Sequence, residues 1–163
     1  LALLRVTYAR DSGKLTILTA IADSSALATH DDISVLTEAG ALLGGIGNYS
    51  LAERYLRIAV AEPPPPVESN DRLFGAMDSS PQKAWDRSKS GAWFQLGFIA
   101  GVSQRYGEAI DCTKKAIDRD SLNERAWVNL VAAYRSTGQD EVADSLAVEI
   151  SRRFPNSQFL NRQ

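Results

Sequence analysis

Trp93-x-x-Leu96-Gly97 and Trp127-x-x-Leu130-Val131 open two segments of the chain that align at an offset of 34 residues. The first segment continues with Tyr106, Ala109, Ala116 and Ser121, and the second with Tyr134, Gly138, Ala143, Ile150 and Pro155. At the same offset Ala109, Ala116 and Ser121 align with Ala143, Ile150 and Pro155. An earlier stretch fits the same frame without the tryptophan, at Leu36, Ala39, Gly40, Leu43, Gly47, Tyr49, Ala52, Leu56, Ala59 and Pro64. Matches at one common offset favour a repeat over an ordinary helical bundle with coincidental spacing.

This pattern resembles the tetratricopeptide repeat (TPR) family, whose 34-residue helix–turn–helix unit reads W-x2-L-G-x2-Y…A-x3-F…P. The resemblance implies an all-α fold, a right-handed α-α superhelix (solenoid) of TPR helix pairs. Three units are clear, and a degenerate pair precedes them. The chain departs from the family pattern at Ala100, Thr113, Ala147 and Gln104, which stand where tyrosine, two phenylalanines and the turn glycine are expected.

Residue sizes give the pattern a physical reason. Small residues let two antiparallel helices approach closely, and large residues fill the space between them. The small set is Gly40, Ala52, Gly97, Ala109 and Ala143, and the large set is Leu56, Trp93, Trp127 and Tyr134. Gly47 and Gly138 are predicted to form turns between paired helices, where the backbone often needs a positive φ. Ser121 and Glu124 are predicted to form a capping box in place of the usual terminal proline.

The repeat frame divides the chain, which we predict to be a single TPR domain over residues 1–163. Its parts are a degenerate helix pair (1–32), a TPR unit (33–66), an insertion with a helix extension (67–89), two further TPR units (90–123 and 124–157) and a tail (158–163). The four prolines from Pro63 to Pro66 must end a helix. They favour a stiff linker, and a polyproline ligand for a partner is the alternative. A new helix is predicted to begin at Pro81, with Ser80 as its N-cap, and to end near Gln104.

The last helix is predicted to carry an apolar strip with little to cover it. The strip consists of Val142, Leu146, Ile150 and Phe154, and only Phe159 and Leu160 follow it. Helical stacks usually finish with a polar-faced capping element. Three explanations stay open: the tail folds back, the cap is missing, or another chain supplies it. Self-association through Leu146, Ile150 and Phe154 is the form that the third explanation would take.

Composition excludes several function classes. A net charge of −2 argues against a nucleic-acid binder, because neutralising phosphates needs an excess of Lys and Arg. The single cysteine, Cys112, rules out an internal disulfide and a Cys-rich zinc site. The single histidine, His30, disfavours a His-based metal centre and a Ser-His-Asp triad. We therefore predict no enzyme, no cofactor and no metal. Apolar runs are too short to span a bilayer, so we expect a soluble domain, cytoplasmic or periplasmic.

Three local features have competing interpretations. Gly44-Gly45-Ile46-Gly47 could suggest a phosphate loop, but no strand pattern precedes it and the repeat already explains Gly47. His30 with Asp31 and Asp32 could suggest metal ligands, but the start of a helix accounts better for the two carboxylates. Cys112 lies in an amphipathic segment far from the histidine, which favours a partly buried structural thiol over a nucleophile.

The resemblance implies that the function is binding of a protein or peptide along a concave wall lined by the first helix of each unit. The family's groove positions fall on Thr37, Glu38, Ala41, Phe94, Gln95, Phe98, Arg125, Val128, Asn129 and Arg135. These residues predict an aromatic floor and an arginine rim, suited to an extended or helical peptide with apolar anchors and a carboxylate. The alternative is that Phe94 and Phe98 pack against the insertion and fill the groove.

The wider context of the binding domain has two interpretations. The first is a protein–protein interaction scaffold within a larger bacterial protein or complex. Arginine outnumbers lysine thirteen to five and no initiator methionine is present, which we take as hints of a bacterial source and a larger chain. The second is an accessory TPR domain of a membrane-associated enzyme, or of a cell-envelope secretion or assembly machine, with catalysis elsewhere.

Overall fold

A computed structural model describes residues 33–64 and 81–157 of the chain. These ranges contain six α-helices and no strand, so the prediction of an all-α architecture is confirmed for them. The helices are α4 (Ile33–Gly45), α5 (Tyr49–Ala61), α7 (Pro81–Val102), α8 (Tyr106–Arg119), α9 (Glu124–Ser136) and α10 (Asp140–Arg153). The predicted degenerate pair (1–32) and the tail (158–163) lie outside the described residues. Of the described helices, none is long and apolar enough to cross a membrane.

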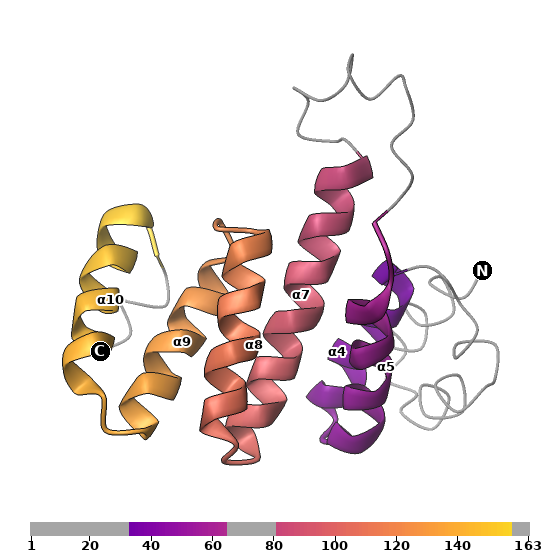
Figure 1. The fold of residues 1–163 in the computed structure, drawn as a ribbon, viewed down its shortest axis with the longest axis horizontal. Helices are drawn as coiled ribbons and strands as arrows, with labels where there is room; N and C mark the ends of the chain where they lie inside the picture. Colours follow the sequence, from indigo (N-terminus) through magenta and orange to yellow (C-terminus); the bar gives the residue numbers. More distant parts are fainter. Residues whose placement is uncertain (1–32, 65–80, 158–163) are drawn as a thin grey trace.

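The helices stand in a row and pack against their neighbours in sequence (Figure 1). Each of α4–α5, α7–α8 and α9–α10 is a helix pair joined by a short turn. The pairs also contact one another, because α7 packs against α4 and α5 on one side and against α9 on the other. The helix α7 is therefore the central element of the described fold, because it contacts the first helix pair on one side and the third on the other.

Amphipathic spacing explains why the second helix of a pair packs as it does. In α5 the buried residues Ala52, Tyr55, Leu56 and Ala59 recur at intervals of three and four residues, which places them on one face. They join the core cluster that also includes Leu36 and Leu43 of α4 and Leu96 and Ile99 of α7. The hydrophobic residues are thus buried between neighbouring helices along the row.

The turns between paired helices place one residue each in the left-handed region of φ. Gly47 has φ = 82° and Gly138 has φ = 72°, as the sequence predicted for these turn positions. The corresponding residue of the middle pair is Gln104, with φ = 60°. A side chain is unfavourable in this conformation because its Cβ approaches the backbone, so Gln104 keeps the turn at an energetic cost.

Helix boundaries agree with the sequence at α7 and disagree at the start of α9. The helix predicted from Pro81 to near Gln104 is present as Pro81–Val102, while Ser80 lies outside the described residues. The capping box of Ser121 and Glu124 was wrong. The N-cap of α9 is Asn123, whose side chain accepts a hydrogen bond from the Ala126 N–H at 3.2 Å. Glu124 is the first residue of the helix, one position after the N-cap, so it cannot serve as the N3 residue of a box.

The apolar strip of α10 is only partly exposed in the structure. Ile150 is 1% exposed, and Leu146 packs against the cluster that contains Ala109, Leu130 and Ala133. Val142 remains 42% exposed. Leu146 therefore contributes to the packing of the described fold, and Val142 stays open to solvent.

Candidate partner-binding groove

A pocket of about 250 Å³ opens between α7 and α9. Its lining comes from three helices and includes Phe98, Val102, Tyr106, Asn129, Ala132 and Ser136. Two large apolar side chains remain partly open to solvent there, with Phe98 at 40% and Val102 at 48% exposure. They lie on the same face of α7 because they are separated by about one helical turn. The pocket is therefore an apolar recess lined by residues of α7, α8 and α9.

Polar groups interrupt the apolar lining at a few points. The Asn129 side chain donates from Nδ2 to Thr113 Oγ1 at 3.4 Å, which fixes its orientation against α8. The Ser136 hydroxyl donates to the Ala132 carbonyl of its own helix at 2.9 Å. Tyr106 adds a half-buried phenol ring from the first turn of α8. An apolar recess with a few oriented polar groups is the usual composition of a ligand site.

Arg125 lies on α9 about one helical turn before Asn129, which lines the pocket. Its guanidinium stands over the Phe94 ring at 5.0 Å from the ring centroid. Phe94 precedes Phe98 by one turn of α7, and Arg125 precedes Asn129 by one turn of α9. Arg125 is exposed and forms no ion pair with a residue in the described ranges. A cation without a carboxylate partner therefore adjoins the apolar recess.

The structure brings together only some of the residues that the sequence placed in a groove. Phe98 and Asn129 line the pocket and Arg125 adjoins it, whereas Phe94 is 8% exposed and packs against Ala116 and Ala126. The Phe94 ring is thus stacked under the Arg125 guanidinium and buried, so it does not form an open floor of the groove. The remaining predicted residues do not line this pocket, and they are Thr37, Glu38, Ala41, Gln95, Val128 and Arg135.

Two of these remaining residues have specific contacts elsewhere. The Thr37 hydroxyl donates to the Ser88 carbonyl at 3.4 Å, so it joins α4 to α7. Arg135 pairs with Asp144 of α10 at 3.3 Å. Val102, Tyr106 and Ser136 also line the pocket, although the sequence pattern did not predict them there. The positions of Val102 and Ser136, one turn after Phe98 and two turns after Asn129, could have revealed them.

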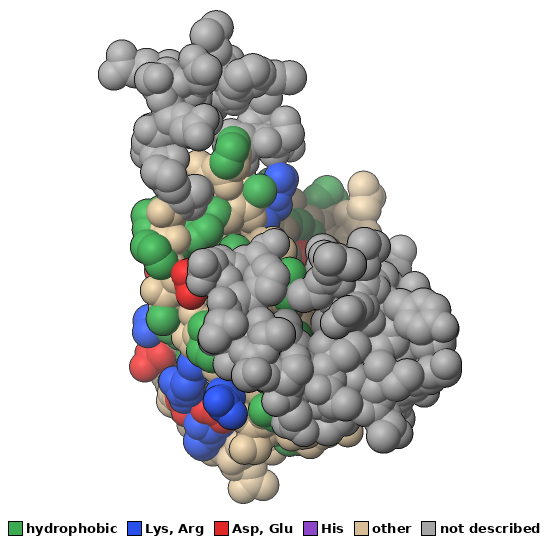
Figure 2. Space-filling view, turned by 90° about the vertical axis from the view of Figure 1, so that its right-hand side faces the viewer, with side chains coloured by type: hydrophobic (Ala, Val, Ile, Leu, Met, Phe, Trp, Pro, Cys, Tyr) green, Lys and Arg blue, Asp and Glu red, His purple; other side chains and the backbone are tan. Residues whose placement is uncertain are grey.

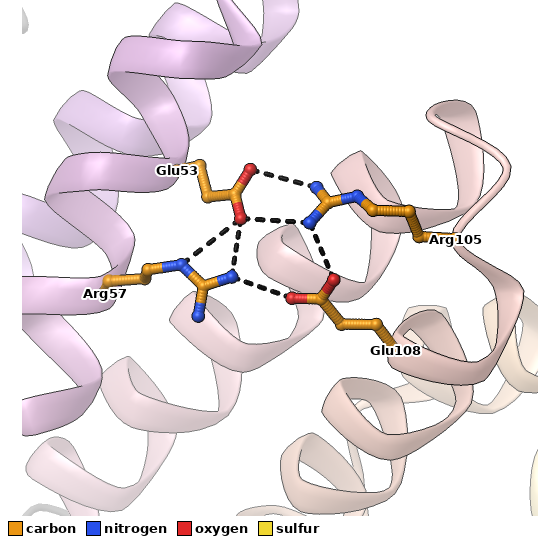
Figure 3. Close-up of polar contacts among 4 residues, drawn as sticks. All are labelled: Glu53, Arg57, Arg105 and Glu108. Atoms are coloured by element: carbon orange, nitrogen blue, oxygen red, sulfur yellow. Dashed lines mark hydrogen bonds and ion pairs between the residues drawn. The ribbon is translucent and has the colours of Figure 1, made fainter.

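A network of two carboxylates and two guanidinium groups joins the first helix pair to the second (Figure 3). Arg105 bridges Glu53 at 2.9 Å and Glu108 at 2.6 Å. Arg57 bridges the same carboxylates at 2.6 Å and 2.8 Å. Hydrogen bonding from Arg105, followed by that from Arg57, lowers the pKa of Glu53 against the opposing effect of burial. A view onto the α4–α5 side shows acidic and basic side chains gathered near its lower edge (Figure 2).

A second contact fastens the other end of the same interface. Lys89 is 7% exposed; its Nζ donates to the Glu62 carbonyl and lies 4.2 Å from the centroid of the Trp85 ring. The Arg119 guanidinium lies 5.3 Å from the centroid of the same ring. Burial, followed by the nearby charge of Arg119, lowers the pKa of Lys89. The predicted extension of α7 therefore attaches to the end of α5, near the start of the proline run.

Cys112 is 5% exposed on α8, in agreement with the predicted structural thiol, and burial raises its pKa. Among the residues in 33–64 and 81–157, no group of three His, Cys, Asp or Glu side chains could hold a metal ion. His30 and its two neighbouring aspartates lie outside these ranges. Comparison with known proteins adds no assignment, since no family model and no curated protein matches the chain.

Proposed function

We propose that this chain is a TPR-type helical-repeat scaffold, without catalytic activity, that binds a peptide or partner segment in the groove between α7 and α9. Equal spacings between corresponding residues of the helix pairs support the repeat. The left-handed turn residues Gln104 and Gly138 are 34 residues apart, which is the length of one TPR unit. The pairs Gly40–Leu56 and Gly97–Thr113 both make a close helix contact, and both are separated by 16 residues.

The observation that carries the binding proposal is the partial exposure of Phe98 and Val102 in a recess. Each has nearly half of its surface in water, although both belong to a helix whose other side is well buried. Large apolar side chains exposed in a concave place are typical of interaction sites, because a partner that covers them removes apolar surface from water. The residues that line the recess belong to helices, so little conformational entropy is lost in ordering the recess when a partner binds.

Site-specific photocrosslinking tests this proposal. A photoreactive phenylalanine analogue at position 98 is expected to capture partner proteins from cells, and the same analogue at position 148 is the matched control. Val148 is an exposed apolar residue of α10, 71% exposed and outside the groove. In parallel, partners are captured by affinity pull-down with protein that carries no photoreactive analogue. In this pull-down Phe98→Glu is expected to abolish capture of the partners, while Val148→Glu leaves it unchanged. Equal capture at the two positions, or capture that survives Phe98→Glu, would contradict the proposal.

A further inference from the structure

We infer that ionic strength controls how often the first interface, between the helix pairs α4–α5 and α7–α8, opens in the native protein. The second interface, between α7–α8 and α9–α10, does not respond to ionic strength in this way. The difference lies in four charged side chains that join the helix pairs at the first interface and have no charged equivalent at the second. This inference concerns the coupling between helix pairs and goes beyond the binding of a partner.

The four side chains are the ionic network of Figure 3. Glu53 and Arg57 belong to α5, Arg105 is the N-cap residue of α8, and Glu108 lies in the first turn of α8. Each arginine contacts both carboxylates at 2.9 Å or less. The network therefore crosses the first interface twice, once from Arg105 to Glu53 and once from Arg57 to Glu108.

The second interface has different residues at the corresponding positions. Gly40 and Gly97 make equivalent close helix contacts and are 57 residues apart, so this offset relates α5 to α8. Gln104 and Gly138 are equivalent turn residues 34 positions apart, and this offset relates α8 to α10. None of the four corresponding residues is acidic, so they cannot form the same network. In the order Glu53, Arg57, Arg105 and Glu108, they are Ile110, Lys114, Gln139 and Val142.

Ile110 shows what takes the place of the ionic contact at the second interface. It is 9% exposed and packs against Leu130 and Ala133 of α9. An apolar contact of this kind carries no charge for salt to screen. The network side chains of the first interface keep between 22% and 54% of their surface in water. Dissolved ions therefore reach them, and their attraction weakens as the salt concentration rises.

An apolar core keeps the open state of the first interface rare. Leu36 and Leu56 of the first helix pair belong to one buried cluster with Leu96 and Cys112 of the second. Partly exposed ion pairs contribute modestly beside such a core, so screening should raise the open population about three- to ten-fold without unfolding the protein. Cys112 is 5% exposed within this cluster, and its reaction with a thiol reagent therefore reports opening of the first interface.

Labelling with an uncharged maleimide, in sodium chloride from about 50 mM to about 1 M, tests this inference. The native rate at Cys112 is expected to rise about three- to ten-fold over this range. The reporter for the second interface is Ala133→Cys in a Cys112→Ala background, because Ala133 is 6% exposed and packs with Ile110. Its rate is expected to change by less than about two-fold. The exposed thiol of Ser145→Cys, in the same background, corrects each rate for the effect of salt on the reagent.

Arg105→Gln tests whether the network causes the salt dependence. It places at the first interface the residue that stands at position 139 of the second, and the Arg105 side chain is 39% exposed, so no core packing is lost. This variant is expected to open more often than the wild type at low salt and to lose most of the rise with salt. Glu149→Gln is the matched control, because Glu149 pairs with Arg152 and Arg153 within α10 alone, and it should keep the wild-type rise.

Each outcome decides for or against the inference. A rise at Cys112 that is absent at the second reporter and lost in Arg105→Gln supports it. A rate at Cys112 that does not change with salt, an equal rise at both reporters, or an unchanged rise in Arg105→Gln overturns it. None of these failures contradicts the binding proposal, since the pocket lies between α7 and α9 at the second interface. Thermal unfolding of each variant checks that the fold is retained.

Discussion

The backbone of Gly40 on α4 lies directly against the Leu56 side chain of α5. A methyl group added to Gly40 would stand 2.4 Å from Leu56 Cγ, and Leu56 itself is 0% exposed. Gly97 has the same relation to Thr113, whose Oγ1 would lie 2.5 Å from such a methyl group. In both helix pairs, therefore, a glycine on the first helix lets a buried side chain of the second helix pack directly against its backbone.

Gly40→Ala is expected to lower the free energy of unfolding by about 1–3 kcal/mol, because the added methyl group displaces a fully packed leucine. Chemical denaturation monitored by circular dichroism measures the change. Gly107→Ala is the matched control, since a Cβ at Gly107 meets no atom within 4 Å and the residue lies in α8. In the control the gain in helix propensity should raise stability by up to about 1 kcal/mol. Equal effects of the two substitutions would contradict the close contact.

A double-mutant cycle of Gly40→Ala and Leu56→Ala tests whether the Leu56 side chain is what the added methyl group displaces. Leu56→Ala alone is expected to cost about 2–5 kcal/mol through the cavity that it leaves. In the double variant the new methyl group has room, so the combined cost should fall below the sum of the two single costs. Additive costs would show that the strain of Gly40→Ala lies elsewhere.

Features that depend on short spacings could be predicted from the sequence, and features that depend on contacts between repeat units could not. The left-handed turns at Gly47 and Gly138 and the start of α7 at Pro81 are fixed by local backbone chemistry. The cap of α9 was missed because Asn123 and Ser121 both suit an N-cap. Asn123 also donates from Nδ2 to Ser90 Oγ on α7 at 2.9 Å, a tertiary contact that the local pattern does not reveal. Local pattern gives candidates, and tertiary packing selects one.

The same limit applies to the candidate groove. Phe98, Arg125 and Asn129 were predicted to lie in one groove, because a repeat frame tells which residues share a helix face. The depth of each side chain does not follow from the frame, so the burial of Phe94 by Ala116 and Ala126 was not foreseen. The network of Glu53 and Arg105 was missed for a similar reason, since its members lie 52 residues apart and meet only when two helix pairs dock.

Gln104→Gly is expected to stabilise the protein by about 0.5–1 kcal/mol, because Gln104 has φ = 60° and a glycine avoids the contact of Cβ with the backbone. The side chain is exposed, so its removal leaves no cavity. Gly138→Gln reverses the exchange at the corresponding turn, where φ = 72°, and should lower stability by a similar amount. Thermal unfolding of both variants measures the shifts, and shifts of the same sign would contradict the strain at Gln104.

Glu53→Gln is expected to lower the free energy of unfolding by about 1 kcal/mol, because it removes the carboxylate that both Arg57 and Arg105 share. The loss should shrink as the salt concentration rises, since the network is partly exposed and its charges are screened. Glu149→Gln is the matched control, because Glu149 pairs with Arg152 and Arg153 within α10 alone. A larger effect for Glu149→Gln would show that the contact between units contributes little.

Acid should also remove the contribution of Glu53. The pKa of Glu53 in the folded protein lies below its ordinary value of 4.5, chiefly because Arg105 donates hydrogen bonds to the carboxylate. Stabilisation by this group is therefore complete above pH 4.5 and declines as the pH falls through the folded pKa. The difference in stability between the wild type and Glu53→Gln should be largest near neutral pH and should close in acid. A difference that does not change with pH would contradict the ionic origin of the contact.

Cys112 is expected to react slowly with an aromatic disulfide reagent in the native protein. It is 5% exposed, and burial raises its pKa, so both access and the fraction of thiolate are low. Reaction then requires local or global opening, and the native rate should lie at least about a hundred-fold below the rate in denaturant. The control is Ser145→Cys in a Cys112→Ala background, which places a thiol on the exposed face of α10 and should react rapidly. Rapid native reaction at Cys112, close to the rate of the control, would show that the interface between α8 and the first helix pair is open.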